Sequence, residues 1–300
     1  MKKSISMLLA AMMLTGALSG CGGSSSSASS DSQASGNDSG VSGAITVISR
    51  EDGSGTRGAF IELTGVEEKN DAGEKIDNTT ADAEIANKTD VVLTSVAGNE
   101  KAIGYISLGA LNDTVKAVKV DGAEATVDNV KAGTYKLSRP FNIATKGEPT
   151  GVAKDFISFI LSKEGQAVVT DNKYIAVNDA AESFVSDGSS GQIAVGGSSS
   201  VSPVMEKLIE AYKSVNPNAS IDLQTSDSTS GMTGAMDGTF AIGMASRELK
   251  DEEAAQLTGT AIALDGIAVI VNPANTIDEL SMDQIKSIYV GDITDWGDLA

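Results

Sequence analysis

Ser49-Arg50-Glu51-Asp52-Gly53-Ser54-Gly55-Thr56-Arg57 follows a strand-like run at 44–48 and leads into the first turns of a helix at 58–63. A loop between a strand and a helix presents backbone N–H groups at the positively polarised helix N-terminus, and its glycines let the chain approach a bound group closely. The planar guanidinium of Arg50 suits a tetrahedral oxyanion. This stretch therefore predicts a small-anion site, with a plain turn carrying a surface arginine as the alternative. A Walker loop is excluded, because its lysine is missing.

The composition of the whole chain argues against several classes of partner and of enzyme. The formal net charge is −19 over 300 residues, which disfavours nucleic acid and anionic lipid as partners. There is no histidine, so the usual general base and the commonest metal ligand are absent. With no evident cluster of metal-binding carboxylates either, we expect no metal, no cofactor and no catalysis, and an enzyme such as a phosphatase is disfavoured.

The N-terminus has the pattern of an export signal. Lys2 and Lys3 precede an apolar run at 5–18, which is shorter than the roughly 20 residues that a bilayer span needs and predicts a signal peptide at 1–20. Cys21 is the only cysteine, so no internal disulfide can form. Residues 22–43 are rich in Ser and Gly and predict a flexible tether.

Two later stretches repeat the arrangement of strand, Ser/Gly loop and helix. The first covers 193–203, where Ser199 and Ser200 lie in the loop, and the second covers 220–232, where Ser228 does. A buried strand at 240–245 ends in Ser246 and Arg247. In α/β folds ligands bind beyond the carboxyl ends of strands, so these loops are expected to meet at one site.

The remaining pattern predicts further elements of an α/β fold. Apolar runs at 91–96 and 102–106 predict short buried strands, and helical spacing at 152–170 predicts one long helix. The segment 186–191 is rich in Ser and Gly and predicts a linker. The apolar run at 261–272 predicts a buried strand that carries a single acid, Asp265.

Several of these stretches together resemble the phosphate-binding lipoproteins of bacterial phosphate ABC transporters. The resemblance covers about 44–300 and rests on Ser-Arg-Glu-Asp-Gly-Ser-Gly-Thr at 49–56, Gly-Ser-Ser-Ser-Val-Ser-Pro at 197–203 and Ile-Gly-Met-Ala-Ser-Arg at 242–247, with support at 102–105, 137–140, 263–272 and 293–296. It implies a two-lobed fold of the periplasmic-binding-protein type II with the ligand in a cleft between the lobes. It also implies an extracytoplasmic, monomeric receptor that delivers inorganic phosphate to membrane permease and ATPase subunits.

The N-terminal Leu18-Ser19-Gly20-Cys21 is similar to the lipobox of bacterial lipoproteins. This similarity implies cleavage before Cys21 and a lipid such as palmitate on that residue, which would anchor the protein to the outer face of the cell membrane.

The order of the motifs differs from the order that we expect in that family, where the Gly-Ser-Ser-Ser segment comes first. We therefore expect a circularly permuted domain. One lobe would combine 44–138 with 268–300, and the other would be continuous over 139–267. A tandem pair truncated at 300 is the alternative.

The resemblance also implies the residues of the site. Those expected to bind phosphate are Arg50, Ser54, Gly55, Thr56, Ser199, Ser200, Ser228, Ser246, Arg247 and Asp265, with Thr229 and Ser230 as rivals of Ser228. Asp52 is expected to orient Arg50. Some family members carry an aspartate at position 247 that accepts the phosphate proton; Asp265 is the candidate replacement here, and an ion pair between Asp265 and Arg247 is the alternative. Sulfate, molybdate or another oxyanion, and a surface adhesin or sensor of the same fold, remain as alternative functions.

Overall fold

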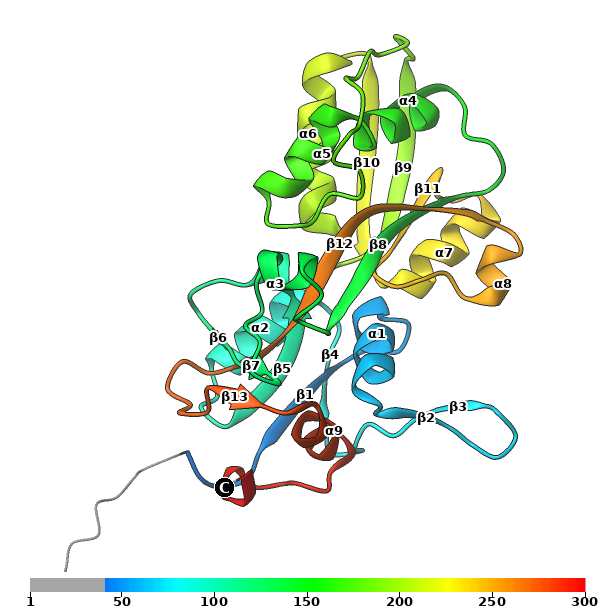
Figure 1. Cartoon of the computed structure of the whole chain (residues 1–300). Coiled ribbons are helices and arrows are strands. Elements are labelled where there is room, and N and C mark those ends of the chain that lie inside the picture. The colour runs from blue at the N-terminus through cyan, green and yellow to red at the C-terminus, as the bar shows by residue number, and fades with distance from the viewer. Residues whose placement is uncertain (1–40, 300) are drawn as a thin grey trace, which may run out of the picture. The chain divides into compact units, whose positions relative to one another are not determined.

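The strand β12 (Thr258–Val271) runs through both hydrophobic cores of the protein in the computed structural model, which describes residues 41–299 (Figure 1). Its first part pairs antiparallel with β8 (Ser138–Thr145), from Thr258 to Gly266. Its last part, from Ile267 to Val271, pairs antiparallel with β5 (Ala102–Ser107). The chain therefore passes twice between two bodies, at the start of β8 and along β12. The first body comprises 47–137 and 267–296, and the second comprises 141–263.

The strands of the main sheet follow a mixed order. Across the sheet they are β10 (Ala219–Ser226), β9 (Gly191–Ser198), β11 (Ile242–Ala245), β8, β12, β5, β1 (Thr46–Arg50) and β4 (Glu84–Ala86), with β6 (Lys116–Ala117) paired to β12. Two small ladders join β13 (Glu279–Leu280) to β7 (Lys119–Val120) and β2 (Glu67–Lys69) to β3 (Lys75–Asp77). The pairs β1–β4, β1–β5, β9–β10 and β9–β11 are parallel. The fold is α/β, as the alternation of strands and helices predicted.

Helices follow most of the parallel strands. They are α1 (Gly55–Thr64), α2 (Thr89–Ala97), α3 (Val127–Lys131), α4 (Gly151–Ile160), α5 (Lys163–Asp171), α6 (Ser202–Val215), α7 (Ser228–Asp237), α8 (Asp251–Ala254) and α9 (Met282–Val290). Short 3-10 turns occupy Leu108–Ala110 and Trp296–Leu299. Within residues 41–299 no helix has both the length and the apolar character that a membrane crossing requires.

Two large apolar cores stabilise the two ends of the main sheet, and a smaller cluster contains Met232 and Leu257. The first core draws on residues 47–137 and 267–296, together with Ile175, and contains Phe60 stacked on Tyr105 at 3.9 Å. The second core lies within 141–263 and contains Phe156, Phe159 and Tyr212. Burial of apolar side chains, these large rings among them, is the main favourable contribution to the stability of each body.

Two predicted elements are wrong. Residues 91–96 form part of helix α2 and not a strand, because Val92 and Val96 face the core four residues apart while Val91 is exposed. The long helix expected at 152–170 is two helices, since the backbone leaves the helix at Ser162, whose hydroxyl caps α5 by accepting from the N–H of Gly165.

The two ends of the described chain lie side by side. Ala44 and Asp295 form an antiparallel bridge, the N–H of Ile45 donates to the carbonyl of Thr294, and that of Trp296 donates to the carbonyl of Gly43. The predicted signal peptide, Cys21 and residues 22–40 of the tether lie outside the described residues.

Candidate anion-binding site

Seven buried hydroxyl groups from the two bodies meet in one network, which we call the hydroxyl cluster. Its members are Thr56, Thr89, Ser198, Ser199, Ser200, Ser228 and Ser246. Thr56 Oγ1 lies 2.8 Å from Ser200 Oγ and 3.5 Å from Ser246 Oγ, which links the first body to the second. Hydroxyls both donate and accept, so such a network can turn its protons toward a bound group.

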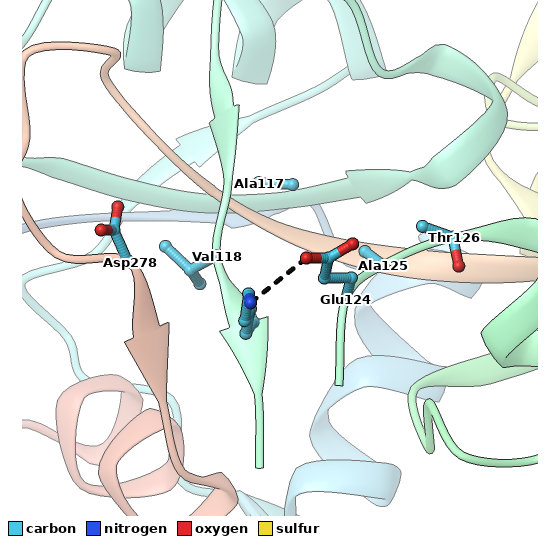
Figure 2. Close-up of a pocket in the computed structure, with 7 residues that line it drawn as sticks. Ala117, Val118, Glu124, Ala125, Thr126 and Asp278 are labelled. Carbon is cyan, nitrogen blue, oxygen red and sulfur yellow. Dashed lines mark ion pairs between the residues drawn. The ribbon is translucent and has the colours of Figure 1, made fainter. Parts of the chain in front are cut away.

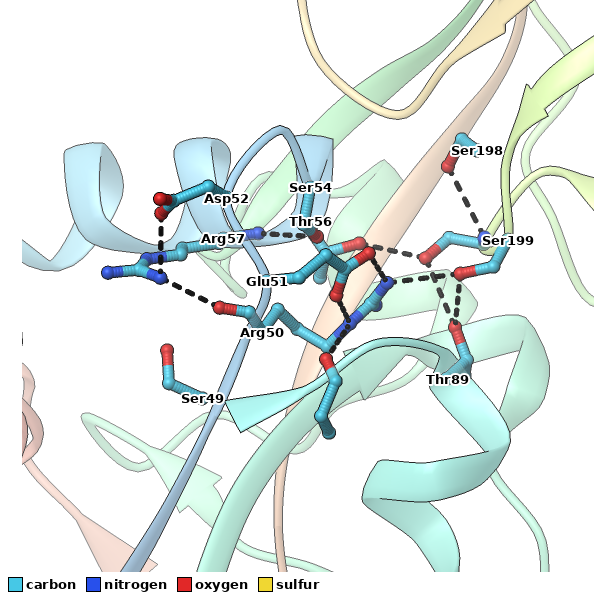
Figure 3. Close-up of polar contacts among 12 residues, drawn as sticks. Ser49, Arg50, Glu51, Asp52, Ser54, Thr56, Arg57, Thr89, Ser198 and Ser199 are labelled. Carbon is cyan, nitrogen blue, oxygen red and sulfur yellow. Dashed lines mark hydrogen bonds and ion pairs between the residues drawn. The ribbon is translucent and has the colours of Figure 1, made fainter. Parts of the chain in front are cut away.

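Arg50 supplies the positive charge beside the hydroxyl cluster (Figure 3). Its side chain is 2% exposed, and its Nη2 donates to Ser199 Oγ at 3.0 Å. Glu51 holds the guanidinium with both carboxylate oxygens, accepting from Nε at 2.8 Å and from Nη2 at 2.9 Å. The third nitrogen, Nη1, is buried and has no partner among the described residues. A buried cationic nitrogen without an acceptor is costly, so this atom calls for an anionic ligand.

Helix N-termini add to this positive potential. The hydroxyl cluster includes the second residue of α1 (Thr56) and the first residues of α2 (Thr89) and α7 (Ser228), and Ser200 lies two residues before α6. The first N–H groups of each helix have no partner within the helix, and the helix dipole favours negative charge there. A chain of strongly negative net charge can thus hold an anion by local donors alone.

Gly55 allows the two bodies to touch at the hydroxyl cluster. A Cβ atom on this residue would lie 2.3 Å from Ser228 Oγ and 2.8 Å from Ser246 Oγ. Next to it, Ser54 caps α1 by accepting from the N–H of Arg57 at 3.3 Å, which leaves the Ser54 hydroxyl proton free to donate elsewhere. Only glycine fits at position 55 in this arrangement.

Tyr105 positions the backbone at Ser49 and Arg50, where β1 ends. Its buried hydroxyl accepts from the N–H of Arg50 at 3.2 Å and lies 2.9 Å from Ser49 Oγ. Burial raises the pKa of Tyr105 to about 12, so the phenol stays protonated and keeps both contacts. The stacking of its ring on Phe60 fixes the hydroxyl in turn.

The structure brings together most of the residues that the sequence suggested. Arg50, Ser54, Gly55, Thr56, Ser199, Ser200, Ser228 and Ser246 lie in or next to the hydroxyl cluster. Of the two rivals of Ser228, Thr229 donates to the carbonyl of Gly53, and Ser230 donates to Asp227. Sequence reasoning missed Thr89 and Ser198. Thr89 is the first residue of a helix that follows a polar stretch, and Ser198 belongs to the Gly-Ser-Ser-Ser segment at 197–200. Both positions therefore had a sequence feature that could have identified them.

Three expected residues direct their charged groups to partners outside the hydroxyl cluster. Asp52 does not orient Arg50: its carboxylate is fully exposed and pairs with Arg57 at 3.2 Å, and Glu51 takes the role because it is the acid adjacent to Arg50 at the end of β1. The guanidinium of Arg247 forms a double ion pair with Glu253, at 2.7 and 2.8 Å.

Asp265 lies where β12 passes between the two bodies. Its oxygens accept from Ser107 Oγ at 3.0 Å and from Arg139 Nη2 at 3.1 Å. The alternative ion pair of Asp265 with Arg247 is therefore wrong; β8 places Arg139 directly opposite Asp265 in the strand register. Complete burial raises the pKa of Asp265 to about 6, although Arg139 opposes this shift.

Two hollows lie outside the hydroxyl cluster. A shallow one of about 370 Å³ beside β6 and β7 contains the ion pair of Lys119 with Glu124 at 3.2 Å (Figure 2). A groove of about 620 Å³ runs between α1 and residues 247–252, with 138–140 as its floor. The second hollow adjoins the cluster at Arg247.

Comparison with known proteins identifies relatives over nearly the whole chain. A family model described as a PBP superfamily domain matches residues 27–164 and 183–300. The phosphate-binding protein PstS 2 of Streptococcus agalactiae is 50% identical over 301 residues, which covers 99% of this chain and 98% of that protein. A crystal structure of a phosphate-binding protein of a phosphate ABC transporter from Streptococcus pneumoniae is 50% identical, with a TM-score of 0.69, over 86% of this chain and all of that one.

More distant relatives match a smaller part. The phosphate-binding protein PstS of Bacillus subtilis is 34% identical over 137 residues, or 45% of this chain and 42% of that protein. The end-to-end match with the Streptococcus agalactiae protein means that this relative has the same order of segments. A circular permutation is therefore not shown by these matches.

Proposed function

Because this chain belongs to the PBP superfamily and, within it, to the family of PstS phosphate-binding proteins, we propose that it is a receptor that binds inorganic phosphate in the hydroxyl cluster. It is a binding protein and not an enzyme. Its relatives are named for phosphate binding and for a phosphate ABC transporter, and delivery of phosphate to the permease of such a transporter is the role that we assign to it.

The observation that carries this proposal is the unpartnered Nη1 of Arg50. Glu51 uses Nε and Nη2, so the remaining nitrogen is the one available to a ligand. Hydroxyls from both bodies lie beside the same guanidinium. Ser199 Oγ of the second body accepts from Nη2, and the network continues through Thr89 and Ser200 to Thr56 of the first body. Hydrogen bonds to charged groups contribute about 1.5–3 kcal/mol each, so a handful of them supports tight binding after the costs of desolvation.

The donors of the site come from two bodies that the start of β8 and the long strand β12 connect. Phosphate bound between them would hold the bodies together, in the manner of hinge closure in binding proteins. We assign Arg50, Ser54, Gly55, Thr56, Ser199, Ser200, Ser228 and Ser246 to this site and add Thr89 and Ser198. Asp265 and the guanidinium of Arg247 are left out, because their partners are Arg139 and Glu253.

The cellular setting follows from the same family membership and from the N-terminal sequence. We propose that the protein works outside the cytoplasm as a monomer. Cys21 carries a lipid that anchors it to the outer face of the cell membrane, and residues 22–43 serve as the tether. Its partners are the membrane permease and ATPase subunits of a phosphate ABC transporter.

The order of its segments is proposed to be permuted relative to relatives such as PstS of Bacillus subtilis. A collinear match that stops at less than half of each chain is what exchanged halves would produce. The adjacent ends of the described chain, joined by the bridge between Ala44 and Asp295, make such an exchange physically simple.

Calorimetric titration of the purified protein, stripped of bound anion, tests the proposed ligand. We expect phosphate to bind. The change Arg50→Gln should weaken this binding about 10- to 100-fold, which is equivalent to the loss of one or two hydrogen bonds to a charged group. Lys213→Gln, an exposed change of the same charge on α6, should leave the affinity unchanged. Absence of phosphate binding would refute the proposal, and equally tight sulfate binding would redefine the protein as a general oxyanion receptor.

A further inference from the structure

We infer that Arg247 restricts the site to inorganic phosphate, because its side chain forms the wall that separates the hydroxyl cluster from the neighbouring groove. This inference rests on the proposed phosphate site. It assigns to Arg247 a steric role in specificity in place of a direct contact with the anion.

The aliphatic part of Arg247 follows α1 away from the cluster. Its Cγ lies 3.1 Å from the position of a Cβ atom built on Gly55, where Ser228 Oγ and Ser246 Oγ also lie. Its Cδ lies 3.8 Å from the corresponding position on Gly58, one turn further along the helix. The side chain therefore begins at the hydroxyl cluster and ends in the groove.

The guanidinium is held firmly at the far end. Glu253, itself 3% exposed, accepts from Nη1 at 2.7 Å and from Nη2 at 2.8 Å, and Nη2 also donates to Thr229 Oγ1 at 3.3 Å. Thr229 in turn donates from its N–H and its hydroxyl to the carbonyl of Gly53 in the other body. Arg247 cannot swing aside without breaking a buried, doubly bonded ion pair.

The groove beyond this wall is large enough for an organic group. Its volume is about 620 Å³, and it is lined by Gly58 and Leu63 of α1, by Leu249 opposite, and by Pro140 on its floor. Gly58 and Arg247 line the groove, whereas Gly55 and the hydroxyl cluster do not. An alkyl substituent on a bound phosphate that points this way would collide with the Arg247 stem, while unsubstituted phosphate would not.

A matched pair of double variants isolates the effect of the stem. Both carry Glu253→Gln, so that no buried carboxylate is left unpaired. Arg247→Ala/Glu253→Gln removes the stem, and Arg247→Met/Glu253→Gln keeps an unbranched apolar stem without its charge. Binding of inorganic phosphate and of ethyl phosphate is measured for the wild-type protein and both variants, together with thermal melting.

We expect wild type and the methionine variant to bind phosphate and to discriminate strongly against ethyl phosphate. The alanine variant should still bind phosphate, and its affinity ratio of ethyl phosphate to phosphate should rise at least about 10-fold, near the 1.4 kcal/mol that corresponds to that factor. An unchanged ratio in an alanine variant that binds phosphate would overturn the inference and leave the proposed function standing. Failure of wild type to bind phosphate would instead remove the proposed function.

If the alanine variant melts below the assay temperature, Arg247→Ser/Glu253→Gln gives the same comparison. Its side chain lacks every atom beyond the γ position, including the Cδ that lies near Gly58. A rise in the ratio of ethyl phosphate to phosphate supports the inference there as well, and an unchanged ratio contradicts it.

Discussion

Gly55 lies where the two walls of the site touch. A methyl group at this position would overlap Ser228 Oγ, at 2.3 Å, and Ser246 Oγ, at 2.8 Å. We expect Gly55→Ala to hold the two bodies apart and to weaken phosphate binding by at least about 10-fold, with little loss of thermal stability, because each core remains intact. Titration with phosphate and a melting curve of the free protein measure the two effects separately.

Gly58→Ala is the control for this prediction. It adds the same methyl group to the same helix, but that group would lie only near Arg247 Cδ, at 3.8 Å, which is an ordinary contact. Affinity should stay within about 2-fold of wild type, and helix propensity should favour alanine by up to about 1 kcal/mol. Equal losses of phosphate affinity in Gly55→Ala and Gly58→Ala would show that the effect comes from a change in helix α1 and not from the contact across the site.

At the scale of elements, helix α4 holds the segment that leads into β9. The buried carboxylate of Asp155 accepts from the N–H of Asp187 at 2.9 Å, from Ser186 Oγ at 2.8 Å and from the hydroxyl of Tyr212 at 2.7 Å. Burial by itself raises the pKa of Asp155, but these hydrogen bonds outweigh it and leave the pKa below 3.8. The carboxylate of Asp155 therefore holds the segment 186–191, which the sequence predicted as a linker, against helix α4.

We expect Asp155→Asn to destabilise the fold by about 1.5–3 kcal/mol at pH 7, the contribution of hydrogen bonds to a charged group. Since the folded-state pKa lies below the unfolded one, this stabilisation is complete well above pH 4 and is lost as pH falls through the folded-state pKa. Denaturant unfolding between pH 3 and 7 should show the gap between variant and wild type closing toward low pH. Asp113→Asn, at an exposed aspartate, should show no gap, and a constant gap for Asp155→Asn would contradict this assignment.

At the scale of the molecule, the neighbouring ends allow the chain to be reconnected. We expect a permutant that joins 299 to 41 through a short Gly/Ser linker, and that opens between Gly188 and Ser189, to fold and to bind phosphate within about 3-fold of the protein with its natural order. The bridge of Ala44 with Asp295 keeps the new joint short, and residues 188–189 lie between α5 and β9 outside every strand and helix.

Circular dichroism and titration measure this outcome. A permutant that folds but has lost phosphate binding would show that the site depends on the present connectivity. One that does not fold would contradict the proposed exchange of halves between this protein and relatives such as PstS of Bacillus subtilis.

Much of the site was predictable because its chemistry is local. A Ser/Gly loop between a strand and a helix presents its donors whatever the rest of the chain does, and three such loops at the ends of strands predict a shared site. Thr56, Ser200 and Ser228 meet there for that reason. The same local patterns, with the absence of histidine and the negative net charge, predict an α/β anion receptor of a recognisable family from the sequence alone.

The tertiary structure alone decided which charged side chains reach the site. Glu51 and Asp52 are adjacent acids, yet Glu51 pairs with Arg50 while Asp52, in the turn at 52–53 that follows β1, faces solvent. Arg247 points toward Glu253, six residues away in sequence, and Asp265 toward Arg139 on a strand that the chain forms 126 residues earlier. The distance between Asp265 and Arg139 is set by the register of β8 on β12, which no short stretch of sequence encodes. Glu51 and Glu253 lie close to their arginines in sequence, and the local course of the folded backbone decides that they, and not Asp52 or Asp265, form the pairs.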